Sequence, residues 1–269
     1  MKRKRNHSLR SSVFIFLAAL FLLFTCSVST IYASTLQKPD IAASGKFVKD
    51  GDYWIYRYDD KTIAKNVFLK IDKKTYYFNK LGHRWCSWHT IKGKNYYFGT
   101  RSQGYLIKNS LIKYKGNYYY VGKDGAMVTG WYTDKSGKKY YFGYNGMAYT
   151  GMKKIGSRYY YFNPKTFELR TNYKYIDSSG NIYYFDKNGI RVQNKFYSIT
   201  VGKQKLTYYF DRNGKAYKGW HTIKGKKYYF YNGTGAKAGV RAQSIKLTSK
   251  NRIVSVFNKD GVCTKQYKA

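Results

Sequence analysis

A twelve-residue stretch occurs twice in this chain and sets the pattern for most of it. Residues 219–230 read GWHTIKGKKYYF and residues 87–98 read SWHTIKGKNYYF, so ten of the twelve positions are identical. Weaker copies close with aromatic runs that end at Phe78, Phe98, Val121, Phe142, Phe162, Phe185, Phe210 and Phe230. The steps between these ends are 20 to 25 residues. A period in this range is typical of a solenoid or another array of small repeated units.

Turn signals divide each repeat into two short strands. Dipeptides such as Asn145-Gly146 and Asn213-Gly214 follow the aromatic runs, and a second glycine, such as Gly93, lies inside the unit. Asn-Gly pairs favour tight turns, and two strands joined in this way form a β-hairpin. One hairpin is marginal alone, so each must be stabilised by its neighbours. We therefore predict an all-β solenoid of stacked β-hairpin repeats of about 20 residues, with little helix.

The aromatic positions alternate along the second strand of each hairpin. Successive side chains of a strand point to opposite faces, so Tyr96 and Phe98 should share one face and Tyr97 should take the other. A second aromatic position recurs in the first strand, after Gly or Ser, at Trp88, Trp131 and Trp220.

These elements occur together in a fixed order and carry a family resemblance. The order of Gly-Trp, inner Gly, Tyr-Tyr-Phe and Asn-Gly resembles the cell-wall-binding repeats of Gram-positive surface proteins, over about residues 51–262. That superfamily includes choline-binding repeats, glucan-binding repeats and clostridial-toxin-type repeats, and the Tyr-Tyr-Phe form is closest to the glucan-binding-like one. The resemblance implies a β-solenoid with ligand sites between neighbouring hairpins.

The N-terminus reads as a secretory signal peptide over residues 1–33. Five positive charges precede an apolar run from Val13 to Phe24, and small residues follow up to Ala33. An uncleaved membrane anchor is the alternative, although the run is short for a span. We expect a linker over residues 34–50 and the repeat array over 51–269, with divergent caps at about 51–66 and 245–269. The expected location is outside the cell, on the wall of a Gram-positive bacterium, with no membrane contact after cleavage.

The charge of the chain is strongly one-sided. It carries 51 Lys and Arg against 13 acidic residues, a net charge of +38, and only five of those cations precede residue 34. Lysines keep an aromatic surface soluble, but a field of one sign also attracts polyanions. Teichoic acid and the phosphate-bearing wall are the expected partners of a secreted protein. Extracellular DNA is the weaker candidate, and no intracellular nucleic acid is expected.

Catalytic chemistry is poorly represented. Glu168 is the one glutamate, and most aspartates lie in turns, where a local hydrogen bond accounts for them. A glycosidase needs two carboxylates that face one bond, and no such pair stands out. His89 and His221 occupy the same position in different repeats, which suits a structural or ligand-edge role better than one metal site. We expect no catalytic residue, no metal and no cofactor.

Exposed aromatic rings suit carbohydrate binding, because a ring offers an apolar face to a sugar and a polar tip to its edge. About two thirds of the Tyr and Phe residues should serve hairpin packing instead. The candidate carbohydrate-binding residues are Trp88, Tyr96, Tyr97, Trp131, Tyr140, Tyr141, Trp220, Tyr228 and Tyr229. Among the tyrosines, we expect Tyr96, Tyr140 and Tyr228 to lie beside the tryptophans.

Choline is an alternative ligand that the residues disfavour. Several ring faces hold a quaternary ammonium by cation–π attraction, and in the choline-binding repeats a second Trp precedes the Tyr-Tyr pair. The matching positions in this chain are Thr75, Asn95, Tyr118, Lys139, Tyr159, Ile182, Thr207 and Lys227. Only two of them are aromatic, and a lysine there would repel the cation.

The sequence thus favours a secreted, non-catalytic protein that binds wall polysaccharide or teichoic acid multivalently. Two functions from other classes stay open: an adhesin or biofilm-matrix protein that binds host or extracellular glycans, and an extracellular polyanion binder.

Overall fold

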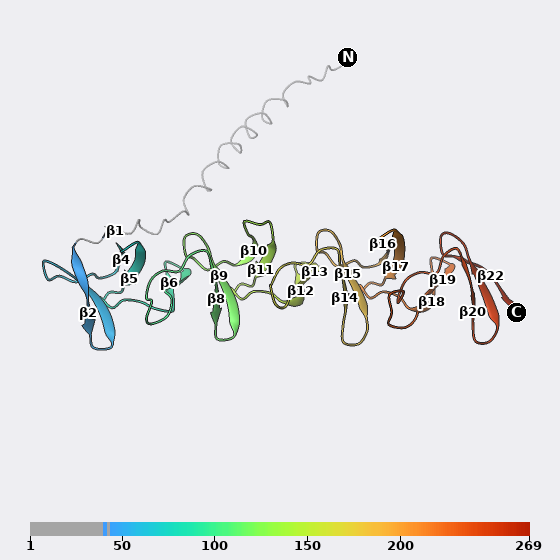
Figure 1. The fold of residues 1–269 in the computed structure, drawn as a ribbon, viewed down its shortest axis with the longest axis horizontal. Helices are drawn as coiled ribbons and strands as arrows, with labels where there is room; N and C mark the ends of the chain where they lie inside the picture. Colours follow the sequence, from blue (N-terminus) through green and yellow to red (C-terminus); the bar gives the residue numbers. More distant parts are fainter. Residues whose placement is uncertain (1–39, 42–43) are drawn as a thin grey trace, which may run out of the picture. The chain divides into compact units, whose positions relative to one another are not determined.

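The computed structural model describes residues 40–41 and 44–269 (Figure 1). Within these ranges every helix or strand assigned is a β-strand, and no helix is long and apolar enough to span a membrane. The expected signal peptide lies outside the described residues. The chain divides into two compact units, of which the first runs up to Ser110 and adds Val121–Ala126, and the second comprises Leu111–Tyr120 and Met127–Ala269.

The strands follow one another as antiparallel hairpins. In the first unit they are β1 (Asp40–Ile41), β2 (Gly45–Asp50), β3 (Tyr53–Tyr58), β4 (Val67–Ile71), β5 (Lys74–Phe78), β6 (Trp88–Ile91) and β7 (Lys94–Tyr97). The hairpin of β8 (Ser110–Tyr114) and β9 (Asn117–Val121) lies where the chain passes from the first unit to the second.

The second unit continues with β10 (Gly130–Thr133), β11 (Lys139–Phe142), β12 (Gly151–Ile155), β13 (Arg158–Phe162), β14 (Tyr173–Ile176), β15 (Ile182–Phe185), β16 (Lys195–Val201), β17 (Gln204–Phe210), β18 (Gly219–Ile223), β19 (Lys226–Phe230), β20 (Ile245–Thr248), β21 (Ile253–Phe257) and β22 (Cys263–Lys268). The sheets are two-stranded, except for β1-β4-β5 and β20-β21-β22. The predicted all-β solenoid of hairpin repeats is confirmed.

The inner glycines close the hairpins as the sequence predicts. Ile91 pairs with Lys94 across a two-residue loop in which Lys92 and Gly93 have φ of 48° and 75°. Two successive positive φ values define the type I′ turn, whose twist matches that of the flanking strands. A residue with a side chain rarely adopts such a φ, whereas glycine adopts it freely. This explains the glycine at the second position of the turn.

The closing aromatic residue of each repeat forms the core. Phe78, Phe98, Phe162, Phe185, Phe210 and Phe230 are fully buried. Tyr96 is only 3% exposed beside Phe98, whereas Tyr97 is half-buried, so the predicted alternation of faces is confirmed. No large common core is needed, because each repeat buries its own phenylalanine against its neighbours.

Backbone hydrogen bonds join consecutive hairpins. In each case an amide in the loop that follows one hairpin donates to a carbonyl in the second strand of the preceding hairpin. We call this set the seam bonds: Arg84 N to Trp54 O, Leu106 N to Thr75 O, Ala148 N to Tyr118 O, Leu169 N to Lys139 O, Arg191 N to Tyr159 O, Ala216 N to Ile182 O and Arg241 N to Thr207 O, at 2.7 to 2.8 Å. They use main-chain atoms, so side chains at the donor positions can vary.

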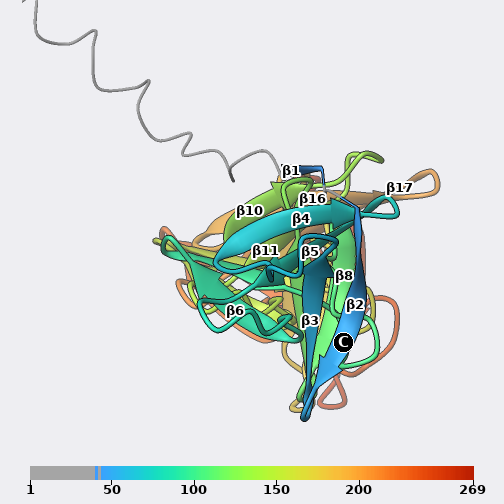
Figure 2. The same cartoon turned by 90° about the vertical axis from the view of Figure 1, so that its left-hand side faces the viewer.

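The array begins earlier than its expected boundary at residue 51. β2 and β3 lie side by side in both views (Figure 2), with Phe47 opposite Tyr56. Phe47 also contacts the rings of Tyr76 and Phe78. Residues 45–50, assigned to the linker from sequence, are therefore the first strand of a hairpin, because this aromatic packing orders them.

Candidate binding site

Three hairpins present the same tryptophan–tyrosine pair. Trp88 faces Tyr97, Trp131 faces Tyr141 and Trp220 faces Tyr229 directly across the strands. Their ring centroids lie 5.1, 5.2 and 5.2 Å apart. Trp131 is 45% exposed and Trp220 is 41% exposed, while Trp88 is half-buried. The repeat thus places a partly exposed tryptophan ring at one register position.

The other three candidate tyrosines do not lie beside the tryptophans. Tyr96 and Tyr228 are buried and pair across the strands with His89 and His221. Tyr140 pairs with Tyr132. The expectation that these three accompany the tryptophans is wrong, because the register places the last tyrosine of each pair, one residue nearer the phenylalanine, opposite Trp.

Neighbouring repeats complete two of the aromatic faces. The ring of Trp131 lies 5.0 Å from that of Tyr160 in β13 of the next hairpin. The ring of Trp220 lies 5.6 Å from Phe257 in β21 and is nearly parallel to it, at 25°. Trp220 also borders a cavity of about 410 Å³ with Ser255, Gln266 and Tyr267 among its walls. A ligand at Trp220 would therefore meet aromatic, hydroxyl and amide groups together.

The ring positions that could hold choline already face cations of this chain. The guanidinium of Arg191 lies 3.9 Å from the ring centroid of Tyr159. The ammonium of Lys227 lies 4.7 Å above Trp220 and donates to Gln266 Oε1 at 2.7 Å. The ammonium of Lys113 lies 5.7 Å from the ring centroid of Tyr118. A quaternary ammonium would have to displace these groups and to meet their charge.

Arginines at the seams are functional candidates that the sequence reasoning missed. Arg191 and Arg241 occupy the donor positions of two seam bonds, and burial lowers the pKa of both. Each donates through Nη2 to a glutamine two residues on, Gln193 at 3.2 Å and Gln243 at 2.9 Å. The signal was present as Arg-Val-Gln and Arg-Ala-Gln at equivalent places in two repeats.

These arginines pass over the turn of the following repeat. A Cβ placed on Gly214 would lie 2.5 Å from Nε of Arg191, and one on Gly261 would lie 2.4 Å from Nε of Arg241. In other repeats an apolar side chain takes this place, as Met127 does over Gly146. The seam thus accepts either an apolar chain or a cation, and the choice changes its electrostatics without changing the backbone.

The repeat histidines have packing roles. His89 stacks on Trp85 at 4.0 Å and His221 on Tyr217 at 3.7 Å, both within 6° of parallel. His89 Nε2 donates to the carbonyl oxygen of Cys86 at 2.9 Å, and burial lowers the pKa of His89. A neutral ring with its proton on Nε2 satisfies both contacts.

The carboxylates serve turns and ion pairs. Asp186 and Asp211 each accept two backbone amides of their own turns. Asp134 accepts the hydroxyl of Tyr140 at 3.0 Å, and Glu168 pairs with Lys138 at 2.7 Å. Over the described ranges, no three His, Cys, Asp or Glu side chains are grouped so that they could hold a metal ion. Local hydrogen bonding accounts for the aspartates that lie in turns, as the sequence indicates.

Known cell-wall-binding repeats match several of the repeats of this chain. A choline-binding family model, described as a cell wall binding repeat, matches residues 68–83, 109–127, 129–146 and 218–237. No curated protein matches the sequence.

Among solved structures, the modular autolysin LytC of Streptococcus pneumoniae, in complex with a synthetic peptidoglycan ligand, aligns with a TM-score of 0.61 at 23% identity. The alignment covers 84% of this chain and 47% of LytC, so the chain spans about half the length of that protein. Choline binding protein F of the same species aligns at 21% identity and a TM-score of 0.43, over 83% of this chain and all of that one. The choline-binding domain of CbpL, also from that species, aligns at 18% identity and a TM-score of 0.42, over 85% and 100%.

Proposed function

Because the chain carries cell-wall-binding repeats folded as a solenoid of β-hairpins, we propose that it is a secreted, non-catalytic protein that binds the wall of a Gram-positive bacterium. Its ligand is wall polysaccharide or teichoic acid, held at several hairpins at once. The observation that carries the proposal is the repeated Trp–Tyr pair, exposed at Trp131 and Trp220 and completed by an aromatic ring of a neighbouring repeat.

Two physical terms combine in this mechanism. Each aromatic face contributes a weak contact that does not depend on salt, and several faces on one chain raise the retention far above that of a single face. The strongly positive net charge of the chain beyond residue 33 adds an attraction to wall phosphate that salt screens. Retention on the wall should therefore have a salt-sensitive part and a salt-resistant part.

The test measures binding of the secreted protein to purified Gram-positive walls over a range of ionic strength. We expect binding to fall steeply with salt, and the remainder to be released by soluble wall glycan. Trp131→Ala and Trp220→Ala should each reduce the salt-resistant part, and the double variant should reduce it more. Tyr144→Ala is the matched control, because Tyr144 is 96% exposed and belongs to no such pair.

Circular dichroism of each variant separates a binding defect from unfolding. If the tryptophan variants stay folded and bind walls as the unchanged protein does, the aromatic faces are not the binding sites. Equal binding at low and high salt would remove the electrostatic term. Elution by free choline, stronger than elution by glycan, would favour the choline alternative, although Arg191 and Lys227 face the rings in question.

The remaining alternatives differ in the partner. Retention on host glycans but not on walls would indicate an adhesin or a matrix protein. A gel shift with duplex DNA at physiological salt would indicate a general polyanion binder.

A further inference from the structure

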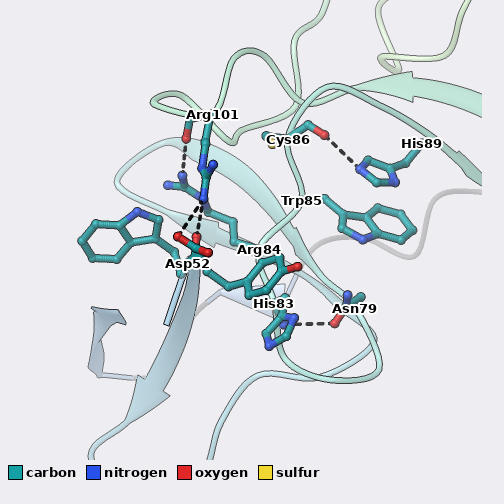
Figure 3. Close-up of a pocket in the computed structure, with 10 residues that line it drawn as sticks. Asp52, Asn79, His83, Arg84, Trp85, Cys86, His89 and Arg101 are labelled. Atoms are coloured by element: carbon teal, nitrogen blue, oxygen red, sulfur yellow. Dashed lines mark hydrogen bonds and ion pairs between the residues drawn. The ribbon is translucent and has the colours of Figure 1, made fainter. Parts of the chain in front are cut away.

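A cavity of about 540 Å³ lies in the first unit, where the loop after β5 meets the first hairpin (Figure 3). Its walls combine aromatic rings with cations. Tyr53 and Trp54 come from β3, Trp85 and Arg84 from the loop after β5, and Arg101 from the loop after β7. This combination differs from the Trp–Tyr pairs described above, which lie on strands of other hairpins.

The rings of the cavity are held in place before any ligand arrives. Tyr53 stacks on His83 with centroids 4.0 Å apart and planes within 2° of parallel. Trp85 stacks on His89 at 4.0 Å and also packs against the ring of Tyr77 at 4.3 Å. The seam bond from Arg84 N to Trp54 O, at 2.7 Å, joins the two walls. Trp54 is nevertheless exposed, so an indole face is available on a fixed backbone.

Arg84 is the first-unit counterpart of the seam arginines. Arg191 and Arg241 each donate to a glutamine two residues on, but the residue two positions after Arg84 is Cys86. Arg84 instead donates through Nη2 to the carbonyl oxygen of Arg101 at 2.8 Å, which is the side-chain hydrogen bond that it makes within the described residues. A guanidinium carries five N–H donors, so most of its donors are left for a ligand.

Arg101 adds a second guanidinium at the rim. Its Nη2 lies 3.5 Å from the carboxylate of Asp52 and donates to the Asp52 carbonyl oxygen at 2.9 Å. Both side chains of the ion pair are largely exposed, and exposed pairs of this kind contribute little free energy. A ligand anion can therefore replace Asp52 as the partner of Arg101 at little cost.

We propose that this cavity binds an acidic sugar unit of the wall glycan, whose acid group is held by Arg84 and Arg101 and whose ring packs on Trp54, with Trp85 in the adjoining wall. Guanidinium donors match the geometry of a carboxylate or phosphate, and flat rings match the apolar face of a pyranose. The volume exceeds that needed for an inorganic anion alone. The proposal rests on the proposed function, since it assigns a ligand class to one part of the wall-binding array.

The test follows the indole N–H signals of the five tryptophans by NMR during titration of the full secreted chain. Single Trp→Phe variants assign the signals. The probes are glucuronic acid, glucose 6-phosphate, glucose and inorganic phosphate. We expect one or both acidic sugars to shift the Trp54 and Trp85 signals and to leave the Trp131 and Trp220 signals unchanged. The sugar that shifts them tells a carboxylate ligand from a phosphate ligand.

Two arginine variants test whether the guanidinium groups hold the acid group of the ligand. Arg84→Gln should weaken binding of the acidic sugar by about tenfold or more, because a charge-assisted hydrogen bond is lost. Arg191→Gln is the matched seam control and should leave the affinity for the acidic sugar unchanged. Arg101→Gln, at an exposed side chain, should weaken binding without a risk to folding. Equal losses in Arg84→Gln and Arg191→Gln would mean that only net charge matters, and would overturn the proposal.

Three other results would also overturn it: no shift at Trp54 and Trp85 with either acidic sugar, an equal shift with glucose, or, where glucose 6-phosphate is the sugar that shifts the signals, equal affinity for inorganic phosphate. These readouts are independent of wall retention. If Trp131→Ala and Trp220→Ala leave wall binding intact while the acidic sugar shifts the first-unit signals, the proposed function fails and the cavity does not. If Trp131→Ala and Trp220→Ala lose wall binding while no acidic sugar shifts the first-unit signals, the proposal for the cavity fails and the proposed function does not.

Discussion

Substitution of two turn glycines tests how the seams are packed. Gly214 and Gly225 have almost the same positive φ, 70° and 73°. Alanine at either position should cost about 1–2 kcal/mol of conformational free energy, because it must adopt a left-handed conformation. The two sites differ in their surroundings, because a Cβ on Gly225 meets nothing within 4 Å, whereas one on Gly214 meets Nε of Arg191 at 2.5 Å and the carbonyl oxygen of Val192 at 3.0 Å.

The difference between the two variants therefore isolates the seam. The conformational cost and the effect on the unfolded chain are common to both and cancel. Overpacking costs about 1–3 kcal/mol, so Gly214→Ala should lose that much more free energy of opening than Gly225→Ala. Part of the excess should be regained with Arg191→Ala, which removes the flexible partner and leaves the Val192 carbonyl.

Native-state hydrogen exchange is the suitable assay, because repeat arrays open locally and a single unfolding free energy is poorly defined for them. The amides of β18 and β19 report on both sites, since this hairpin follows Gly214 and encloses Gly225. Equal losses in the two variants, or a larger loss in Gly225→Ala, would refute the close packing of Arg191 over the turn.

Two further predictions concern ionisation. Burial, hydrogen bonding and nearby charge raise the pKa of Tyr132 and Tyr140 to about 12, so these two should stay protonated after exposed tyrosines have ionised in an alkaline absorbance titration, and Asp134→Asn should lower the Tyr140 value. Burial lowers the pKa of His89 in the folded protein below its ordinary 6.5. The folded state therefore favours the neutral ring, and its stability is unaffected by this group above pH 6.5. As the pH falls from 6.5 through the lowered pKa, stability is lost, because the unfolded chain binds the proton more readily. Local hydrogen exchange should show that loss, and His89→Gln should remove it; an unchanged acid-side profile in the variant would contradict the assignment.

Much of the architecture could be predicted because one residue type recurs at each structural position. The closing phenylalanine, the inner glycine and the Asn-Gly turn each have a single physical reason, and the structure confirms each of them at sites such as Phe210, Gly93 and Gly214. The start of the array at Gly45 escaped prediction, because Phe47 is ordered by rings that are distant in sequence.

The candidate sites were predicted less completely. Strand alternation correctly separates Tyr96 from Tyr97, but it cannot tell which of them faces Trp88, because that depends on the register across the hairpin. The cavity of the first unit was out of reach for a similar reason. Trp54, Arg84 and Arg101 lie in three different repeats, and only the stacking of those repeats brings them together.

The seam bonds have a consequence for how such a chain can diversify. They join main-chain atoms, so Arg191, Ala216 and Leu169 all hold their neighbours through the same amide while presenting unrelated side chains. Mutation at these places alters the chemistry of one junction and leaves the register of the others intact. Each junction can thus differ from the next in side-chain chemistry while the main-chain bonds that join the repeats stay the same.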